Sequence, residues 1–552
     1  MSGDQATPAL RREIGFWGLT AIVVGGIIGS GIFALAATLG SVAGPAGIIA
    51  LLLLIGVVIV LALPYAELGA AYPRSGGPYS IPRRALGNFG GFLVGWGYFL
   101  YAFTGTAAII DVFVEYLGTY VNGLVTSANV LTWTGISVGL AFLLAYTLLN
   151  VVGVKWGTGF AMVTSFAKVI PLLLFGFIGL YFLRTGNFSI GGFAPFGWLG
   201  VAFAMSLSFF AFTGFEAAVI PSEEVQNPQR VLPRATIVGV VTVAVIYALV
   251  ALSFIGGMRW AANGLVPGDW AGTSGLLLNN IADGWGLPLL AAIMVLGAVL
   301  STLGAGGDWV LLQGRIPYAM AQDNLFFKSL SKVHPRYSTP AFALIFASAL
   351  TGVTLILLPS FPEVALIASI TTLVPYAAAG LSLAVLRRTE PRVPRPFRLP
   401  GGVVLAPIGF VLATILIYWA SWPWTFVGPI LILVGVPLYY LFEKVTRQEA
   451  RRIAWLGVYL GGLALLSYLG NPFFTYDNFL PFGPIGVLGT PLDMVVVAIF
   501  GLAIYVWGYY SAIGSWTAGG EPLPHGRRPE ASKGTSSSPP PLPVPGSSGG
   551  TP

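Results

Sequence analysis

The sequence predicts an all-α polytopic membrane protein, built on two halves of five spans that enter the membrane from opposite sides. Three observations lead to this fold class. Of the 552 residues, 56% are hydrophobic and 9% are charged, whereas ordinary soluble domains carry about 25% charged residues. Apolar runs of about 20 residues, the length that a helix needs to cross a bilayer, recur along the chain. Two of these runs, at matching positions in the two halves, are interrupted by glycine.

Fourteen candidate spans follow from the apolar runs. They lie near residues 15–40, 44–71, 87–118, 130–151, 157–183, 198–221, 235–257, 285–320, 340–359, 363–386, 403–421, 424–442, 453–470 and 491–515. Spans 1–10 would form a core over residues 13–389, and spans 11–14 four additional C-terminal spans over 390–518. Residues 1–12 would be a short N-terminal segment. Residues 519–552 are rich in Pro, Ser and Gly and are expected to form a disordered tail.

The positions of Lys and Arg predict the orientation. With the N-terminus in the cytoplasm, 24 of the 27 Lys and Arg residues fall in inner segments. Only Arg184 and Arg259 fall outside, and Lys168 falls within a span. This asymmetry predicts a protein of the cell membrane with both termini cytoplasmic. The net charge of +7 then reflects orientation and contact with anionic lipid headgroups rather than nucleic-acid binding.

The first span contains the stretch GGIIGSGIF at residues 25–33, with four glycines in seven residues. Each glycine costs a helix about 1 kcal/mol relative to alanine, and unsatisfied backbone groups cost several kcal/mol more in a bilayer. Such a break can line a binding cavity, as in secondary transporters, or the glycines can let two helices pack closely. A second break, FFAFTGFE at residues 209–216, lies in span six. Paired breaks in corresponding spans favour a binding site.

Short motifs follow one another over residues 12 to about 440. They are Gly26–Phe33, Tyr65–Gly69, Pro73–Tyr79, Phe212–Glu216, Glu223–Arg230, Arg315 with Tyr318–Met320, and Arg395–Gly401. Together they resemble the amino acid–polyamine–organocation (APC) superfamily of permeases. The resemblance implies a LeuT-type, five-plus-five inverted-repeat core with discontinuous spans 1 and 6, and spans 13 and 14 are similar to a fourteen-span branch. It also implies secondary active transport of amino acids by alternating access; the oligomeric state is not predicted.

An amino acid presents a carboxylate and an ammonium group, and each needs partners when it is buried. The break in span one would expose N–H groups near Ser30 and Gly31 at the start of a half-helix, where an anion is favoured. Ser30 would add its hydroxyl. The resemblance assigns the same positions to the backbone of the amino acid. The carbonyl groups expected to accept from the ammonium are those of Ile27, Phe210, Ala211 and Thr213.

Two residues of span eight are candidates for contact with the substrate side chain or the coupling ion. Trp309, in the sequence Gly-Gly-Asp-Trp, resembles a tryptophan of the arginine/agmatine-exchanger branch that contacts the substrate, and packing against neighbouring helices is the alternative. Asp308 departs from that branch's pattern. An intramembrane carboxylate is a functional candidate, so Asp308 could neutralise a cationic substrate, carry a proton, or pair with Arg315.

Lys168 and Glu216 are the other candidates for coupling and gating. Lys168 would lie roughly 18 Å into the membrane on helical rise, unless it sits near a helix end. The resemblance places it where sodium-coupled relatives hold a cation between spans one and eight. Burial destabilises its charged form, so a proton could bind and leave, which predicts sodium-independent, proton-coupled transport. Glu216 matches the family's acid after the second break and is expected to move with gating.

Other functions are less well supported. The chain has no cysteine and only two histidines, and we expect no cofactor, no metal site and no enzymatic activity. The two breaks differ, whereas a channel would repeat its pore motif. Within transporters, the alternative is an exchanger of cationic amino acids or polyamines.

Two further groups of charged residues lie at the ends of predicted spans. Asp111 and Glu115 are expected near the outer end of span three and are given no role. A cytoplasmic latch that changes between transport states is expected from the acids and bases Glu223, Glu224, Arg230 and Arg234.

Overall fold

The computed structural model describes residues 14–72, 77–126, 129–152, 158–219, 225–470 and 480–517. Within these ranges the chain is helical, with isolated bridges and no strand. The α-helices are α1 Phe16–Ile27, α2 Gly31–Ala43, α3 Gly47–Ala71, α4 Gly77–Gly118, α5 Trp133–Val152, α6 Thr158–Tyr181, α7 Gly197–Ser208, α8 Pro228–Gly256, α9 Leu278–Gly284, α10 Pro288–Gln322, α11 Ala341–Leu357, α12 Phe361–Thr389, α13 Gly402–Trp419, α14 Trp424–Leu433, α15 Gly435–Tyr440, α16 Arg447–Leu469 and α17 Leu492–Thr517. The 3-10 helices used below are η3 Phe209–Phe212 and η4 Phe215–Val219.

Every predicted span contains a helix or a pair of shorter helices. Nine helices in the described part of the chain are long and apolar enough to cross a membrane, and five shorter apolar helices accompany them. The first predicted span is divided between α1 and α2, and the sixth between α7, η3 and η4. The all-α prediction and both predicted breaks are therefore confirmed.

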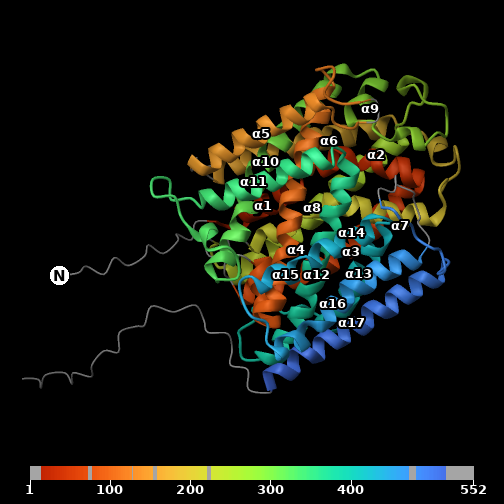
Figure 1. Ribbon diagram of the computed structural model, residues 1–552. Helices are drawn as coiled ribbons and strands as arrows, with labels where there is room; N and C mark the ends of the chain where they lie inside the picture. Colours follow the sequence, from red (N-terminus) through yellow and green to blue (C-terminus); the bar gives the residue numbers. More distant parts are fainter. Residues whose placement is uncertain are drawn as a thin grey trace, which may run out of the picture.

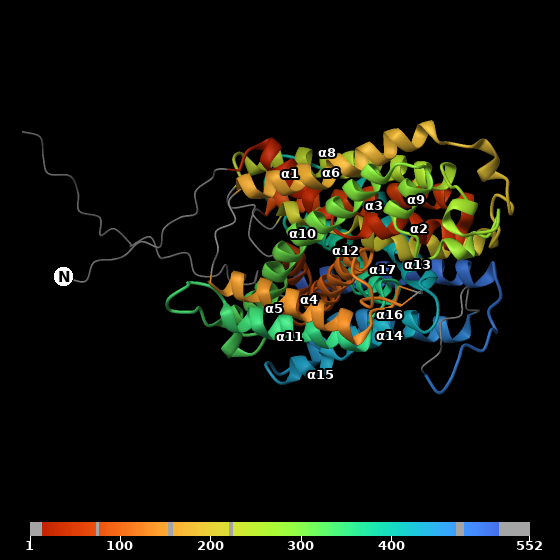
Figure 2. The same ribbon diagram turned by 90° about the horizontal axis from the view of Figure 1, so that it is seen from above.

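The arrangement separates two faces (Figure 1). The described ends of the chain, at the start of α1 and the end of α17, lie on one face, which we call the terminal face. Helix α9 and the loops beside it lie on the opposite face, which we call the distal face. Seen from above (Figure 2), α1, α6 and α8 lie side by side, in agreement with their packing contacts. Helices α13, α14, α16 and α17 pack onto the core through α12 and α4.

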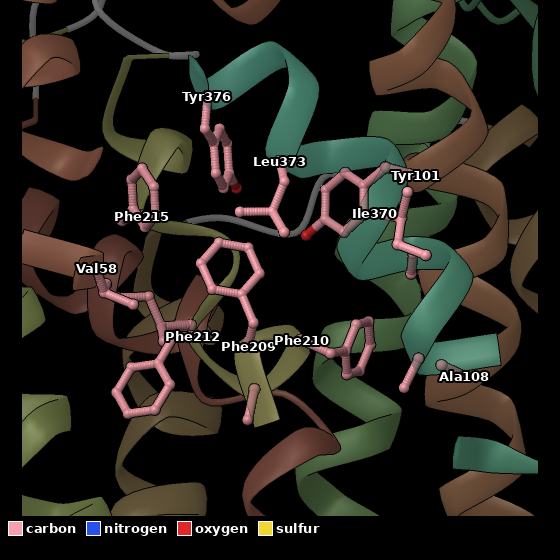
Figure 3. Close-up of a cluster of buried hydrophobic side chains, with 14 of the residues drawn as sticks. Val58, Tyr101, Ala108, Phe209, Phe210, Phe212, Phe215, Ile370, Leu373 and Tyr376 are labelled. Carbon is pink, nitrogen blue, oxygen red and sulfur yellow. The ribbon is translucent and has the colours of Figure 1, made fainter. Parts of the chain in front are cut away.

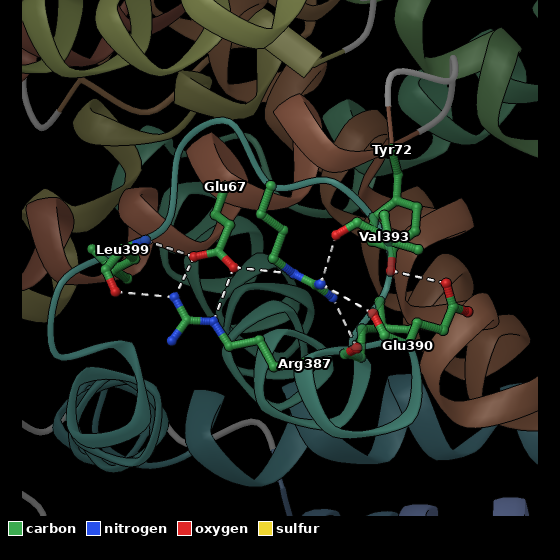
Figure 4. Close-up of polar contacts among 8 residues, drawn as sticks. Glu67, Tyr72, Arg387, Glu390, Val393 and Leu399 are labelled. Carbon is green, nitrogen blue, oxygen red and sulfur yellow. Dashed lines mark hydrogen bonds and ion pairs between the residues drawn. The ribbon is translucent and has the colours of Figure 1, made fainter.

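A buried acid on the terminal face joins two sequence motifs that are more than 300 residues apart (Figure 4). Glu67 of α3 is fully buried. Its carboxylate accepts from the Arg387 Nε at 2.9 Å and from the Leu399 N–H at 2.7 Å. The Arg387 Nη2 makes a second contact with the same carboxylate, and the Arg395 Nε lies 3.4 Å from it. These contacts hold the end of α12 and the following loop against α3.

A second ion pair lies beside the first. The Arg84 guanidinium donates to both carboxylate oxygens of Glu390 at 2.8 Å, and the Tyr72 hydroxyl donates to the same carboxylate at 3.0 Å. This bidentate geometry is the stronger form of an ion pair. It ties α4 and the end of α3 to the chain just after α12.

We expect Glu67→Gln to lower the free energy of unfolding by about 3–5 kcal/mol, because it leaves a partly buried guanidinium without its counter-charge. Chemical denaturation in detergent micelles measures the change. Asp283→Asn is the matched control, since Asp283 is exposed and no hydrogen bond or ion pair of its carboxylate is found in the described ranges. Equal stability of the two variants would contradict this role for Glu67.

Candidate substrate and coupling site

The break in the first span leaves a helix start inside the protein. Helix α1 ends at Ile27, Ile28 leaves the helical conformation with ψ 84°, and α2 begins at Gly31. No side chain caps α2. The Phe33 N–H donates to the Ser30 carbonyl at 3.1 Å, whereas no hydrogen bond of the Gly31 or Ile32 N–H is found among the described residues. The Ser30 hydroxyl is buried and has no hydrogen-bond partner among the described residues. Unpaired donors at a helix N-terminus are suited to a carboxylate.

Three side chains from three other helices satisfy the carbonyl groups of the broken segment. The Lys168 ammonium of α6 donates to the Gly25 carbonyl at 3.2 Å. The Tyr247 hydroxyl of α8 donates to the Ile27 carbonyl at 3.2 Å, and the Ser301 hydroxyl of α10 donates to a third carbonyl, that of Gly29, at 2.8 Å. A carbonyl group without a partner costs several kcal/mol in a bilayer. The break is therefore held open by donors that surround it.

The second break runs through η3 to Gly214, whose φ of +106° favours glycine. The Thr213 hydroxyl and N–H donate to the Phe210 carbonyl at 2.7 and 3.2 Å. The Tyr247 hydroxyl donates to the Ala211 carbonyl at 2.9 Å, so this one hydroxyl serves both breaks. Because Thr213 already occupies the Phe210 carbonyl twice, we expect an ammonium group to use the other predicted carbonyls.

The two breaks cross in direct contact. A Cβ atom on Gly31 would lie 2.6 Å from the Ala211 Cα, and one on Gly214 would lie 2.3 Å from the Gly26 carbonyl oxygen. The φ of Gly31 is not in the left-handed region. The reason for a glycine at position 31 is thus the close approach of the other break.

A small cavity lies where the breaks cross. Its lining includes Ile27, Ser30, Gly31, Phe210, Thr213 and Trp309, together with Tyr101, Gly105 and Ile109 of α4. Six of the seven predicted substrate-binding residues line this cavity. The seventh, Ala211, does not line it and packs against Gly31. The cavity measures about 10 Å³, which is room for about one water molecule. The site is therefore closed around the predicted positions, and an amino acid needs them to separate.

The aromatic side chains of the second break have different surroundings (Figure 3). Phe210 points toward α4 and lines the cavity, whereas Phe209, Phe212 and Phe215 point into the packed core. Trp309 packs edge-on against Tyr101, with ring centroids 5.1 Å apart, and also lines the cavity. Trp309 therefore packs against a neighbouring helix, and its contact with a substrate side chain stays a prediction.

Lys168 is the charged residue that acts on Asp308. The two side chains interact electrostatically, although no direct ion pair joins them. Lys168 is 1% exposed, which excludes its placement near a helix end in contact with water. The pairing of Asp308 with Arg315 and the roles of Asp308 toward a substrate or a proton, considered from the sequence, stay predictions.

Glu216 connects the second break to the rest of the core. Its carboxylate is fully buried and accepts from the Tyr98 hydroxyl of α4 at 2.8 Å and from the Tyr376 hydroxyl of α12 at 2.6 Å. The Gly214 N–H donates to it at 3.1 Å. A movement of η4 would therefore pull on α4 and α12, and the gating role of Glu216 stays a prediction.

Some residues of the site were missed, and one prediction cannot be examined. Tyr247, Ser301 and Tyr101 carry no sequence signal beyond a hydroxyl group in an apolar span, and the chain has many of these. Glu223 and Glu224 of the expected latch lie outside the described residues.

The chain matches the family model "Amino acid permease" over residues 14–442. It belongs to this family. The family has the LeuT-type fold, which confirms the predicted fold class. The chain is 30% identical over 528 residues to the glutamate/serine transporter AimA of Bacillus subtilis, covering 91% of this chain and 94% of that protein. It is also 28% identical to the aspartate-proton symporter of the same bacterium, and the match covers 91% of this chain and 97% of that protein. The cationic amino acid transporter 4 of Mus musculus matches 69% of this chain and 60% of its own length at 29% identity.

We expect Gly31→Ala to abolish uptake of substrate while the protein is still produced, because its Cβ would force apart two backbones that touch. Overpacking of this kind costs about 1–3 kcal/mol, and the site must also close around a ligand. Radiolabelled uptake in proteoliposomes measures the effect. Gly56→Ala is the control, since a Cβ there meets nothing within 4 Å. Full uptake by Gly31→Ala would contradict the contact.

Tyr247→Phe leaves two buried carbonyl groups without their donor, at a cost of about 1–3 kcal/mol. A bound ammonium group would replace the lost donor. We therefore expect a lower unfolding temperature without substrate and a larger upward shift on adding substrate than in the wild type. Tyr505→Phe is the control, because the buried Tyr505 makes no hydroxyl hydrogen bond to the described residues. If substrate raised the unfolding temperature equally in the wild type, Tyr247→Phe and Tyr505→Phe, the substrate ammonium group would not bind these two carbonyl groups.

Proposed function

We propose that this permease carries amino acids across the cell membrane by alternating access, coupled to protons and independent of sodium. The observation that carries the proposal is the Lys168 ammonium on the Gly25 carbonyl, 3.2 Å away, beside the first break. A fixed ammonium group there supplies the positive charge that an inorganic cation would otherwise bring. A lysine buried to this degree can lose its proton without leaving its place, whereas a sodium ion must enter and leave.

The carboxylate of the amino acid would bind the unpaired N–H groups at Gly31 and the Ser30 hydroxyl. Its ammonium would bind carbonyl groups that Tyr247 now occupies, those of Ile27 and Ala211. Since the cavity has room for only about one water molecule, binding requires α1 and α2 to move relative to the second break. The Lys168 contact with α1 weakens when the ammonium loses its charge, which links proton release to this movement.

The relatives support small polar or acidic amino acids as substrates. The two with the fullest coverage are named for glutamate and serine and for aspartate with a proton. A second candidate, an exchanger of cationic amino acids or polyamines, is favoured by the Asp308 carboxylate next to the cavity residue Trp309.

The terminal face is the proposed cytoplasmic side. The basic residues of the network at Glu67 and Glu390 lie there, as the excess of positive charge on cytoplasmic segments leads us to expect. Both termini would then be cytoplasmic.

Lys168→Ala is expected to keep substrate binding measurable while reducing net uptake at least about tenfold and removing its dependence on a proton gradient, because the titrating ammonium is gone. Uptake and binding are measured in parallel, with Arg184→Ala, an exposed basic residue, as the control. Wild-type uptake that requires a sodium gradient would overturn the coupling proposal.

Asp308→Asn separates the two candidate substrate classes. If the carboxylate neutralises a cationic side chain, the variant loses lysine or polyamine uptake and keeps uptake of neutral amino acids. If it acts with Lys168 on the proton, pH dependence changes for every substrate. Competition by serine, glutamate, lysine and a polyamine, measured for wild type and variant, decides between them.

A further inference from the structure

Two acids of α4 that the substrate site does not use are buried one helical turn apart. Asp111 is 0% exposed and Glu115 is 6% exposed. Neither carboxylate oxygen of Asp111 has a hydrogen-bond partner among the described residues, and no hydrogen bond to Glu115 is found there either. The sequence placed both near the outer end of the span without a role. Their position toward the distal end fits that expectation, but their burial without partners needs an explanation.

The groups around the pair do not neutralise it. The charged neighbours that act on Asp111 are Glu115 on the same helix and Glu363 on α12, and both are acids. The adjacent Tyr116 hydroxyl is engaged elsewhere, since it donates to the Phe33 carbonyl at 3.0 Å and accepts from the Leu278 N–H at 3.3 Å. Within the described ranges, no three His, Cys, Asp or Glu residues are arranged to hold a metal ion.

Glu115 lines a cavity of about 200 Å³ on the distal side. The cavity has room for roughly a dozen water molecules, and serine side chains such as Ser41 and Ser274 share its wall. Among the described residues, no Lys, Arg or His lines it. Its inner wall includes Phe361, whose ring packs edge-on against Phe210 with centroids 5.8 Å apart. These two rings separate the distal cavity from the closed substrate site.

Physical chemistry limits the charge that the pair can carry. A buried carboxylate with no partner is very costly, and two such groups one turn apart repel each other when both are ionised. The arrangement is thus compatible with at least one bound proton shared by the two groups. Water in the distal cavity reaches Glu115, and Glu115 lies one turn from Asp111, so a proton has a short route in and out.

We propose that Asp111 and Glu115 form a proton-binding site that fills from the distal cavity. Each carboxylate takes up one proton from cavity water to become a carboxylic acid and returns it to that water. This inference rests on the proposed proton coupling. It adds a second proton-binding site, which lies on the other side of the substrate cavity from Lys168. An ionised Asp111 would be repelled by the Glu363 carboxylate. This repulsion would favour a larger separation of α12 from α4 near Phe361. Proton binding therefore favours the closed distal end.

Uptake at two values of distal pH tests the site. The ratio of initial uptake rates at about pH 5.5 and about pH 8 is expected to exceed about three in the wild type and to be smaller in Asp111→Asn, in which the Lys168 site alone still titrates. Because both rates are measured on the same variant, their ratio does not depend on the overall activity of that variant. Glu115→Gln, at the cavity wall, is a second variant with the same expected result if Asp111→Asn does not fold. Asp283→Asn, an exposed acid, is the control and keeps the wild-type ratio.

Infrared difference spectroscopy of the purified full-length protein observes the proton directly. The carbonyl band of a protonated carboxylic acid should be present near neutral pH and lost in Asp111→Asn, while Asp283→Asn retains it. A wild-type pH ratio in both site variants, or an unchanged band, would overturn the proposal. A ratio that depends on sodium or potassium instead of pH would assign the site to a metal cation and overturn it too. Absence of any amino acid uptake by the wild type would refute the proposed function and leave the infrared test valid.

Discussion

The structure depends on one constraint, which is that a helix interrupted inside a membrane must find hydrogen-bond partners within the protein. The interrupted first span has three carbonyl groups satisfied by Lys168, Tyr247 and Ser301. These donors come from α6, α8 and α10, so the break fixes how these three helices lie around α1 and α2. The second break packs directly on the first, and Tyr247 bonds to both.

The same contacts explain why this site can be both stable and mobile. Donors that close the empty site, such as the Tyr247 hydroxyl, occupy carbonyl groups that an ammonium group can use. In the proposed binding mode, the substrate would exchange one hydrogen bond for another and would not leave a buried carbonyl group unpaired, which would cost about 1–3 kcal/mol. Lys168 adds a charge to this exchange, and its proton can change the strength of the contact between α6 and α1.

Buried acids are treated differently on the two faces. On the terminal face, Glu67 is surrounded by guanidinium groups and an N–H donor, so its charge is compensated and its role is to hold helices together. On the distal side, Asp111 and Glu115 have acids as their charged neighbours. The same residue types thus serve structure where bases surround them, and we propose that they bind protons where, among the described residues, the charged neighbours are acids.

The sequence by itself determined the helices, the two breaks and most of the residues that line the cavity where the breaks cross. Length, hydropathy and glycine content act locally, and in a bilayer a local stretch must form its own hydrogen bonds, so apolar runs translate directly into helices. Only the tertiary structure decided which side chains reach the breaks. Tyr247 and Ser301 come from other helices and look like any hydroxyl in an apolar span. It also decided that Asp308 interacts electrostatically with Lys168 and that the Asp111 carboxylate has no hydrogen-bond partner among the described residues. Such relations depend on how separate helices rotate and pack against one another, and no single stretch of sequence carries that information.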